Sequence, residues 1–243
     1  MASERTGFHT AAVEQNQWKP AVQAYLACIA FADAQLGRLL DALDASPYAD
    51  NTIIVLWSDN GMHLGQKEHW TKWGLWEQAT RVPLIIVAPG VTKPGARCDT
   101  PVSLLDLYPT LVELCDLPAV DRLEGESLVP LLRDPQAIRD TPAITTHGPM
   151  NHSIRTARWR YIRYRDGSEE LYDHRTDSLE WKNVAGEAEF QEELRGLRKW
   201  LPVVNVPDPP YHDRKQYWPG DPSPDEVSDY PGKCPEPANA TRE

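Results

Sequence analysis

One short apolar run, together with the side chains on which it ends, constrains this chain most. Residues 52–57 read Thr-Ile-Ile-Val-Leu-Trp, a series of β-branched and large apolar side chains that is typical of a buried strand. The run stops at the turn-forming sequence Ser58-Asp59-Asn60-Gly61. Because ligands of α/β sheets bind just beyond the carboxyl ends of the strands, we expect a binding site at this position.

The side chains of this turn are suited to a hard cation. The carboxylate of Asp59 and the amide oxygen of Asn60 are oxygen donors of the kind that Ca²⁺ and Mg²⁺ prefer. Gly61 lets the backbone turn away tightly, and Lys72 offers a positive point charge to an anionic ligand. Taken one at a time, however, these residues are more typical of an ordinary strand-end turn, for Asp59 and Asn60, and of a solvated surface lysine, for Lys72.

The remaining pattern divides the chain into three parts. Apolar residues at helical spacing predict helices over residues 19–45 and 103–115, and a short helix is expected at 73–80. A second strand is expected at 84–88, and residues 1–17 are expected to form a loop. This alternation of strands and helices indicates an α/β fold over residues 1–140. Over residues 141–205 we predict a small subdomain with a helix at 186–201 and short antiparallel strands at 143–146, 153–156, 161–164 and 170–173. Residues 206–243 are expected to form a Pro-rich tail.

The spacing of the residues that follow Lys72 indicates a resemblance to a known protein family. Glu77, Arg81 and Pro83 stand five, nine and eleven residues after that lysine. With the strand and the Asp-Asn-Gly turn before it, this arrangement resembles the type I sulfatases of the alkaline phosphatase superfamily. The segments Asp33–Leu40 and Ser103–Leu111 fit the same family, and the resemblance extends over about residues 19–205. The most similar group is the bacterial polysaccharide sulfatases related to iduronate-2-sulfatase. The resemblance implies the C-terminal part of an alkaline-phosphatase-like sulfatase core, followed by the small antiparallel subdomain.

The resemblance also implies a chemical role for several residues. Asp59 and Asn60 would coordinate one Ca²⁺, and Lys72 would act as a catalytic residue that binds a sulfate oxygen. The activity implied is that of a sulfuric ester hydrolase, with a sulfated polysaccharide or glycosaminoglycan-type sugar as substrate. Glu77 and Arg81 are expected to form an i,i+4 pair that braces the loop carrying Lys72.

Further substrate contacts are expected on two loops. His63 and His69 flank the metal loop, where they would either bind a sugar hydroxyl or pack in the interior. Asn151, His152 and Arg155 lie in a polar segment that would either recognise a charged sugar or form a purely structural loop.

The nucleophile of the family is not encoded in this chain. Type I sulfatases use a formylglycine made from Cys or Ser within Cys-x-Pro-x-Arg, and none of Cys28, Cys98, Cys115 and Cys234 lies in that motif. We therefore expect formylglycine only in the full-length enzyme, a missing N-terminal half as partner, and no turnover by the isolated chain. The alternatives are a non-catalytic, truncated binding chain and a phosphatase or phosphonate hydrolase of the same superfamily. A two-zinc phosphatase site would need more histidine ligands than this turn offers.

Charge and composition narrow the remaining possibilities. A net charge of -11 argues against nucleic-acid binding, which needs basic patches. No apolar run reaches the roughly 18 residues that a membrane-spanning helix requires. The polar residues 1–18 contain no signal peptide, although the resemblance implies a periplasmic or secreted full-length enzyme.

Overall fold

The computed structural model describes residues 7–206 of the chain. Its contacts define two compact units, of which the first ends at Ala143 and the second begins at Ile144. The domain boundaries that we predicted, at residues 140 and 205, stay a prediction, and the predicted tail lies outside the described residues apart from Val206. Within the described residues, no helix is both long enough and apolar enough to cross a membrane.

The first unit opens with two helices, α1 (Gly7–Glu14) and α2 (Trp18–Asp44). The long helix α2 confirms the helix expected at residues 19–45, whereas the loop expected over residues 1–17 was wrong for residues 7–14. The reason is tertiary: the ring of His9 on α1 packs edge-on against Trp18 at 5.1 Å, and Trp70 Nε1 donates to His9 Nδ1 at 3.3 Å. These contacts stabilise a helix that is too short to form by local preference.

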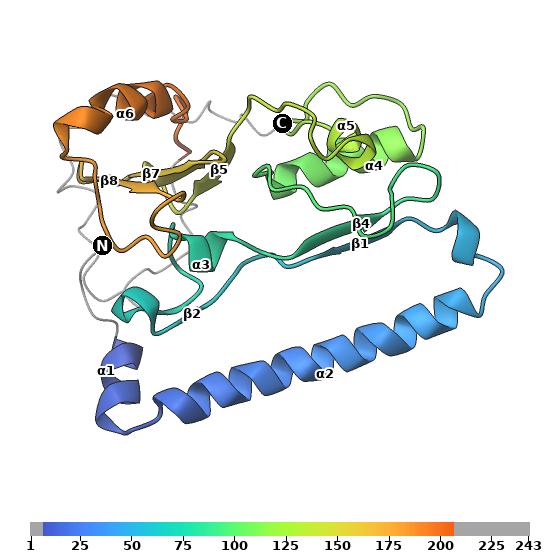
Figure 1. Cartoon of the computed structure of the whole chain (residues 1–243), viewed down its shortest axis with the longest axis horizontal. Coiled ribbons are helices and arrows are strands. Elements are labelled where there is room, and N and C mark those ends of the chain that lie inside the picture. Colours follow the sequence, from blue (N-terminus) through green and yellow to red (C-terminus); the bar gives the residue numbers. More distant parts are fainter. Residues whose placement is uncertain (1–6, 207–243) are drawn as a thin grey trace, which may run out of the picture. The chain divides into compact units, whose positions relative to one another are not determined.

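A two-stranded ladder carries the candidate metal turn. After the short 3₁₀ helix η1 (Ala49–Asn51), strand β1 (Ile54–Trp57) pairs antiparallel with β4 (Leu84–Val87), with Ile54 opposite Val87 and Trp57 opposite Leu84. Both strands lie within the runs that we predicted. The carboxyl end of β1 therefore lies beside the amino end of β4, and the chain between them begins with residues 58–72, which we call the site loop (Figure 1).

The site loop contains a hairpin that the sequence pattern did not reveal, whereas the short helix expected at residues 73–80 is present over residues 77–80. A small hairpin pairs β2 (His63–Leu64) with β3 (Trp70–Thr71) across the 3₁₀ helix η2 (Gln66–Glu68), and helix α3 (Glu77–Thr80) follows. Gly65 has φ 104°, and a Cβ at this position would overlap the Trp18 ring. Such two-residue strands are too short for any periodicity to predict, so contacts with α1 and α2 must define them.

The helix expected at residues 103–115 begins with the 3₁₀ turn η3 (Leu104–Asp106), which continues as α4 (Leu107–Leu114). Its N-terminus is held by Asp106, which is 1% exposed. The Asp106 carboxylate accepts from the Ser103 and Glu126 amides at 2.7 and 2.8 Å and pairs with Arg139 at 2.9 Å. This single buried carboxylate thus ties η3 to the later segment that carries α5 (Val129–Arg133).

The second unit is a four-stranded sheet with one helix. The strands are β5 (Ala143–Thr146), β6 (His152–Arg155), β7 (Trp159–Arg163) and β8 (Glu169–Asp173), in the order β5-β6-β7-β8, and β7 pairs antiparallel with both β6 and β8. The 3₁₀ turn η4 (Ala188–Phe190) leads into α6 (Gln191–Arg198). The helix and sheet enclose a core of Ile154, Trp159, Tyr161, Leu171, Val184, Leu194 and Leu197. The predicted small antiparallel sheet is confirmed, and the expected helix is shorter at both ends.

Candidate functional site

The Asp59–Asn60 turn is shaped by its own hydrogen bonds. Ser58 Oγ donates to the Asn60 carbonyl at 2.9 Å, and the Asn60 amide N–H donates to Asp59 Oδ1 at 3.0 Å. The side-chain nitrogen of Asn60 donates to the Gly61 carbonyl at 2.8 Å. These bonds engage the nitrogen of the Asn60 amide and one oxygen of Asp59, so the Asn60 side-chain oxygen and the second Asp59 oxygen are the atoms suited to a cation.

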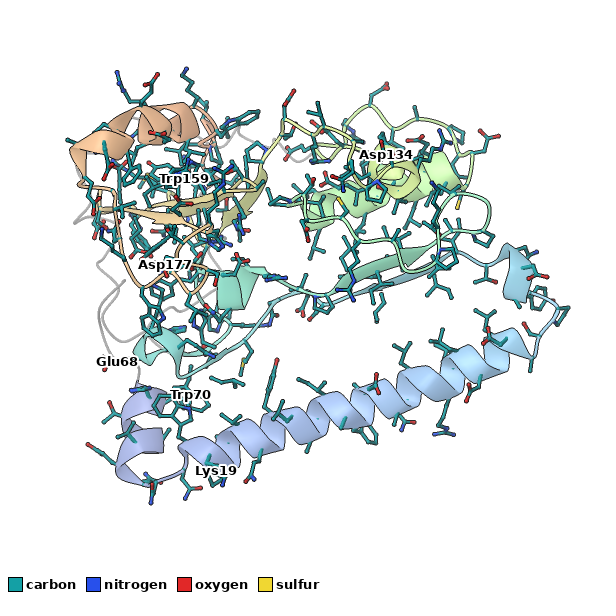
Figure 2. The ribbon with its side chains drawn as sticks, in the orientation of Figure 1. Lys19, Glu68, Trp70, Asp134, Trp159 and Asp177 are labelled. Atoms are coloured by element: carbon teal, nitrogen blue, oxygen red, sulfur yellow. The ribbon has the colours of Figure 1, made fainter. Side chains whose placement is uncertain are left out.

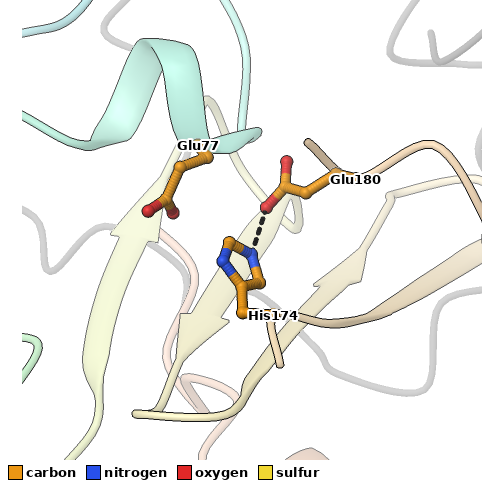
Figure 3. A group of neighbouring side chains, drawn as sticks. All are labelled: Glu77, His174 and Glu180. Atoms are coloured by element: carbon orange, nitrogen blue, oxygen red, sulfur yellow. Dashed lines mark hydrogen bonds and ion pairs between the residues drawn. The ribbon is translucent and has the colours of Figure 1, made fainter. Parts of the chain in front are cut away.

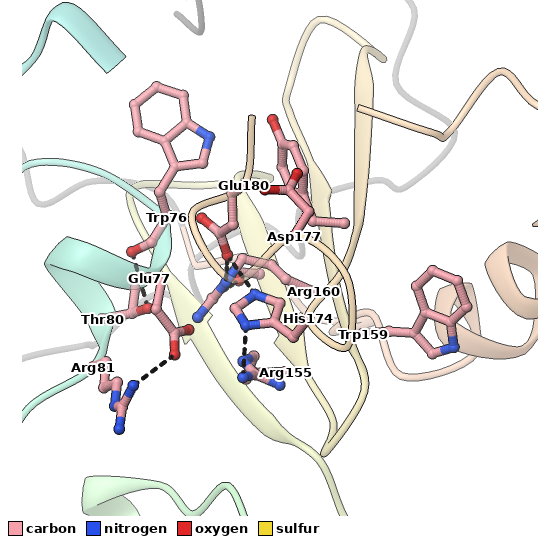
Figure 4. A network of polar contacts seen from close by, with 12 residues as sticks. Trp76, Glu77, Thr80, Arg81, Arg155, Trp159, Arg160, His174, Asp177 and Glu180 are labelled. Atoms are coloured by element: carbon pink, nitrogen blue, oxygen red, sulfur yellow. Dashed lines mark hydrogen bonds and ion pairs between the residues drawn. The ribbon is translucent and has the colours of Figure 1, made fainter. Parts of the chain in front are cut away.

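Gly61 anchors this turn to α3. Its N–H donates to the Ala79 carbonyl at 2.8 Å, and a Cβ at this position would overlap the Gln78 carbonyl oxygen. Only glycine allows the two backbones to approach this closely. The predicted i,i+4 pair is present between Glu77, the first residue of α3, and Arg81, which directly follows the helix, with Arg81 Nη1 3.9 Å from Glu77 Oε1 (Figure 4). The turn after β1 is therefore held by backbone contact with the helix that follows Lys72.

Lys72 follows directly after β3 and is exposed. Its Nζ lies 5.6 Å from the centroid of the Trp73 ring, within the range of a cation–π contact. The residue before it, Thr71, has φ 87°. A β-branched residue in this conformation is an outlier, and such strain is retained mainly where the surrounding structure imposes it, often at functional sites. Because Thr71 pairs with His63 across the hairpin, the hairpin sets the position of the Lys72 backbone.

The structure places His63 and His69 in a buried aromatic cluster. They are 0% and 9% exposed, their rings meet edge-on at 4.9 Å, and both contact Trp76 edge-on at 5.7 and 6.0 Å. His63 Nδ1 also lies 3.3 Å from the Gln66 carbonyl oxygen. Of the two alternatives for these histidines, the packing role is visible here, and sugar recognition by them stays a prediction. Trp70, labelled in Figure 2, is likewise buried, at 7% exposure.

In the second unit, Asn151 organises the loop before β6. Its amide nitrogen donates to the carbonyls of His147 and Pro149 at 3.1 and 3.3 Å, and its oxygen accepts from the Arg165 amide at 2.9 Å. The loop backbone contains positive φ values at Gly148 and Met150, 66° and 67°. Asn151 therefore uses its side chain to close this loop.

His152 lies at the start of β6 with 2% exposure. Its Nε2 faces the Asn205 side-chain oxygen at 2.8 Å, and its Nδ1 faces the Thr146 hydroxyl at 2.8 Å. Because an amide oxygen can only accept, we assign the proton to Nε2 and the acceptor role to Nδ1. Burial lowers the pKa of His152, and the hydrogen bond with Asn205 partly opposes that effect. The ring is therefore a neutral link between β5, β6 and the segment after α6.

Arg155 ends β6 within a chain of buried polar groups. Its Nη2 donates to His174 Nδ1 at 2.9 Å, and its Nη1 donates to the Thr156 carbonyl. Since arginine only donates, His174 carries its proton on Nε2, which lies 2.9 Å from Glu180 Oε1 (Figure 3). Glu180 Oε1 also lies 2.6 Å from Arg160 Nε (Figure 4).

Our sequence reasoning missed Arg160, His174 and Glu180. Arg160 and Glu180 are 2% and 0% exposed, and Arg160 Nη1 donates to Ser153 Oγ at 2.6 Å. Charged residues are almost never fully buried unless they are paired, and here the pairing supplies the reason. An isolated arginine on a strand and a glutamate in a loop carry no sequence signal of this pairing.

The candidate residues thus form two sets, one in each unit. Asp59, Asn60, His63, His69 and Lys72 lie in or beside the site loop of the first unit. Asn151, His152 and Arg155 lie on the β5–β6 loop and β6 of the second unit.

Comparison with known proteins defines the family of this chain. The family model described as Sulfatase matches residues 2–117, and the model described as N-sulphoglucosamine sulphohydrolase, C-terminal, matches residues 65–205. The chain therefore belongs to the type I sulfatase family of the alkaline phosphatase superfamily, and it corresponds to the C-terminal portion of that family.

Individual relatives agree with this assignment. A sulfatase of Formosa agariphila is 47% identical over 195 residues, a match that covers 80% of this chain and 38% of that relative. Arylsulfatase K of Gallus gallus is 33% identical, with 75% and 37% of the two chains covered. The chain thus spans less than half of the length of these relatives.

Solved structures show the same fold. One is a protein in complex with its substrate D-glucosamine-2-N,6-O-disulfate, with a TM-score of 0.61, 28% identity and coverage of 72% of this chain and 38% of that one. A 2-O glycosaminoglycan sulfatase has a TM-score of 0.59 at 27% identity, with 69% and 39% covered. The phosphonate monoester hydrolase of Agrobacterium radiobacter has a TM-score of 0.59 at 27% identity, with 75% and 44% covered.

Proposed function

We propose that this chain supplies the metal- and sulfate-binding segment of a sulfuric ester hydrolase that acts on a sulfated carbohydrate. The observation that carries the proposal is the Asp59–Asn60 turn at the end of β1, followed by Lys72 at the end of the hairpin, in a member of the sulfatase family. Two similar structures support a sulfated carbohydrate as the substrate. One is a complex with a disulfated glucosamine, and the other is a 2-O glycosaminoglycan sulfatase.

The donor set fits one Ca²⁺ in part. Asp59 is exposed, and it stands next to Asn60 with oxygens that the turn's own hydrogen bonds do not use. Ca²⁺ takes about six to eight oxygen ligands, so these two residues form only part of its coordination shell. The remaining ligands would come from the N-terminal part of the family's domain. Once bound, a divalent ion would neutralise negative charge that develops on the transferred group.

Lys72 is proposed to bind a sulfate oxygen. A lysine ammonium is a compact point charge suited to an anionic oxygen, and its contact with the Trp73 ring limits where it can lie. Through the bond from Gly61 to Ala79, α3 would keep the Asp59–Asn60 turn in place.

The roles of the remaining residues follow from their contacts. We propose that Asn151, His152 and Arg155 contribute to sugar binding mainly by holding the β5–β6 loop, because their side chains bind groups of the same unit. His63 and His69 would support the site loop by packing against Trp76. The chain encodes no Cys-x-Pro-x-Arg, so we expect it to hydrolyse nothing without a segment that carries the formylglycine.

The test is an assembled enzyme. The chain is joined to the N-terminal part of the Formosa agariphila sulfatase, and sulfate release from sulfated monosaccharides is measured. We expect Lys72→Ala to lower kcat by about a hundredfold or more, as is typical when a group that stabilises transition-state charge is removed. Lys93→Ala, at an exposed loop position, is the matched control and should leave kcat unchanged. Chelation by EGTA should abolish turnover and added Ca²⁺ restore it. Full turnover by the Lys72→Ala enzyme would refute the role of Lys72.

A second candidate activity is hydrolysis of a phosphonate monoester. This activity is supported by the similarity to a phosphonate monoester hydrolase, whose TM-score equals that of the glycosaminoglycan sulfatase. The same assembled enzyme, given a phosphonate monoester and a sulfate ester in parallel, decides between the two by the ratio of the kcat/KM values.

A further inference from the structure

One end of the sheet in the second unit is fixed by two asparagine side chains. The loop before β6 and the turn after β7 lie at the same end of the sheet, because these two strands are antiparallel neighbours. The Asn151 side chain links the loop to the turn, since its oxygen accepts from the Arg165 amide at 2.9 Å. The Asn205 side-chain oxygen accepts from the Met150 amide at 2.9 Å and so adds the segment after α6. Three segments of the chain are therefore held together at this end.

The Arg165 side chain in this turn differs from the other arginine side chains of the second unit. It is half-buried, and its Nε is shielded from solvent with no acceptor among the described residues. The other buried or half-buried arginines of this unit all contact an acceptor: Arg155 contacts His174, Arg158 contacts Asp173, Arg160 contacts Glu180 and Arg163 contacts Glu169. Within residues 144–206, Arg165 is thus the single half-buried arginine whose side chain has no acceptor.

The carboxylates closest to Arg165 in the sequence are engaged by other groups. Asp166 Oδ1 accepts from two donors of its own turn at 2.8 and 2.6 Å. Glu169 Oε1 accepts from Arg198 Nε at 2.8 Å. A buried N–H without an acceptor is unfavourable, and buried charges in proteins are usually paired. The surroundings of Arg165 are therefore suited to an anion that the described residues do not provide.

The chemistry of the guanidinium defines the class of this anion. Nε and the neighbouring Nη form a planar fork that can bind two oxygens of a carboxylate or of a similar oxyanion such as a sulfate. The Arg165 backbone is held by Asn151, for which we propose a part in sugar binding. A sulfated sugar carries oxyanions of this kind, so one ligand can satisfy the guanidinium at the loop that Asn151 closes.

We propose that Arg165 binds an oxyanion of the sugar other than the sulfate ester that is hydrolysed. The identity of the sugar rests on the proposed function, whereas the oxyanion site itself rests on the contacts of the second unit. Arg165 is then a residue that determines specificity, because it contacts the substrate away from the bond that breaks. Asn151 acts through it as a positioning residue.

The first measurement needs no turnover. The 243-residue chain is labelled with ¹⁵N-arginine, and the Nε–Hε NMR signal of Arg165 is assigned by its loss in Arg165→Gln. The probes are D-glucosamine-2-N,6-O-disulfate and the neutral sugar N-acetylglucosamine. We expect the disulfated sugar to shift the Arg165 signal with saturation, and the neutral sugar to leave it in place.

Matched variants separate the guanidinium from total charge. Arg165→Gln should raise the Kd of the disulfated sugar by about tenfold or more, because it removes both the charge and the fork. Arg165→Lys keeps the charge without the fork, so its Kd should lie between those of the wild type and Arg165→Gln. Arg175→Gln removes the same charge from an exposed position after β8, at the opposite end of the sheet, and should leave the Kd unchanged.

The enzyme assembled with the N-terminal part of the Formosa agariphila sulfatase tests the specificity. Arg165→Gln should raise the KM of the disulfated sugar about tenfold and leave kcat unchanged, as expected when a contact that is equal in the ground and transition states is removed. Both constants for a monosulfated sugar should stay unchanged, which general damage to the fold would not allow. If the assembled enzyme releases no sulfate while the Arg165 signal still shifts, the proposed function fails and the oxyanion site stands.

Four results would overturn the oxyanion site. The first is an Arg165 signal that the disulfated sugar does not shift. The second is an equal Kd for the wild type, Arg165→Gln and Arg175→Gln. The third is an unchanged KM in an active assembled enzyme that carries Arg165→Gln. The fourth is a shift of the Arg165 signal, with no sugar present, when the Asp and Glu residues of 207–243 are replaced by Asn and Gln, since one of those carboxylates would then be the acceptor.

Discussion

At the residue scale, buried polar groups define much of the chemistry of the second unit. His152 and Arg155, which the sequence suggested as substrate contacts, each bind partners within that unit. Arg160 and Glu180 form a buried ion pair that no local pattern predicts. A buried charge loses its hydration, so it persists only where the fold provides a partner.

The environment of His152 leads to a pH-dependent stability. Its pKa in the folded state is lowered, chiefly by burial, whereas the unfolded imidazole binds a proton near its ordinary value. The unfolded state therefore takes up more protons on acidification, and stability should fall as the pH drops below about 6.5, until the pH reaches the lowered folded value. Urea unfolding of the wild type and of His152→Gln at several pH values between about 7.5 and 5.5 measures this, and the stability advantage of the wild type should shrink toward low pH. An advantage that is constant with pH would contradict the assignment.

At the scale of elements, the site loop is defined by packing more than by pattern. The strands β1 and β4 were predictable because a short, continuous apolar run of β-branched residues between turn-forming residues is typical of a buried strand. The hairpin β2–β3 and helix α3 are two to four residues long, and contacts with α1, α2 and the Asp59–Asn60 turn hold them.

A substitution at Gly61 tests whether the Asp59–Asn60 turn is attached to α3. A side chain at this position would overlap the Gln78 carbonyl, so Gly61→Ala should destabilise the first unit by about 1–3 kcal/mol, as overpacked sites do. Gly37→Ala is the matched control: nothing lies within 4 Å of a Cβ there, and alanine favours a helix, so this change should be neutral or stabilising. Urea unfolding, followed by circular dichroism, measures both. Equal stabilities of the two variants would show that the turn does not lie against α3.

At the scale of the whole molecule, the two units differ in how completely they enclose their own apolar residues. Ile154, Tyr161, Leu171 and Leu194 of the second unit are all 0% exposed, and they come from its own sheet and α6. The first unit, by contrast, leaves large apolar side chains exposed on α2 and on the β1–β4 ladder, namely Leu26, Ile29, Leu39, Trp57, Ile85 and Val87.

This difference predicts how the separate units behave. A polypeptide of residues 141–206 should fold with a single cooperative unfolding transition, because its core is closed by its own helix. Leu194→Ala should cost it about 2–5 kcal/mol, the usual cost of truncating a fully buried leucine. A polypeptide of residues 1–143 should bind a hydrophobic dye such as ANS. Calorimetry and dye fluorescence make the comparison, and a non-cooperative 141–206 polypeptide would contradict it.

The sequence by itself determined the family, the α/β class, the strands β1 and β4, the long helix α2 and the small antiparallel sheet, because these depend on long apolar runs and on the Lys72–Pro83 spacing. It also pointed to Asp59, Asn60 and Lys72, whose proposed roles depend on residue type and spacing. Only the tertiary structure decided that residues 7–14 form a helix, that His63 and His69 pack with Trp76, and that Arg160 pairs with Glu180. Those features depend on contacts between residues far apart in the chain. The sequence around a residue does not show which distant residue it will contact in the folded protein.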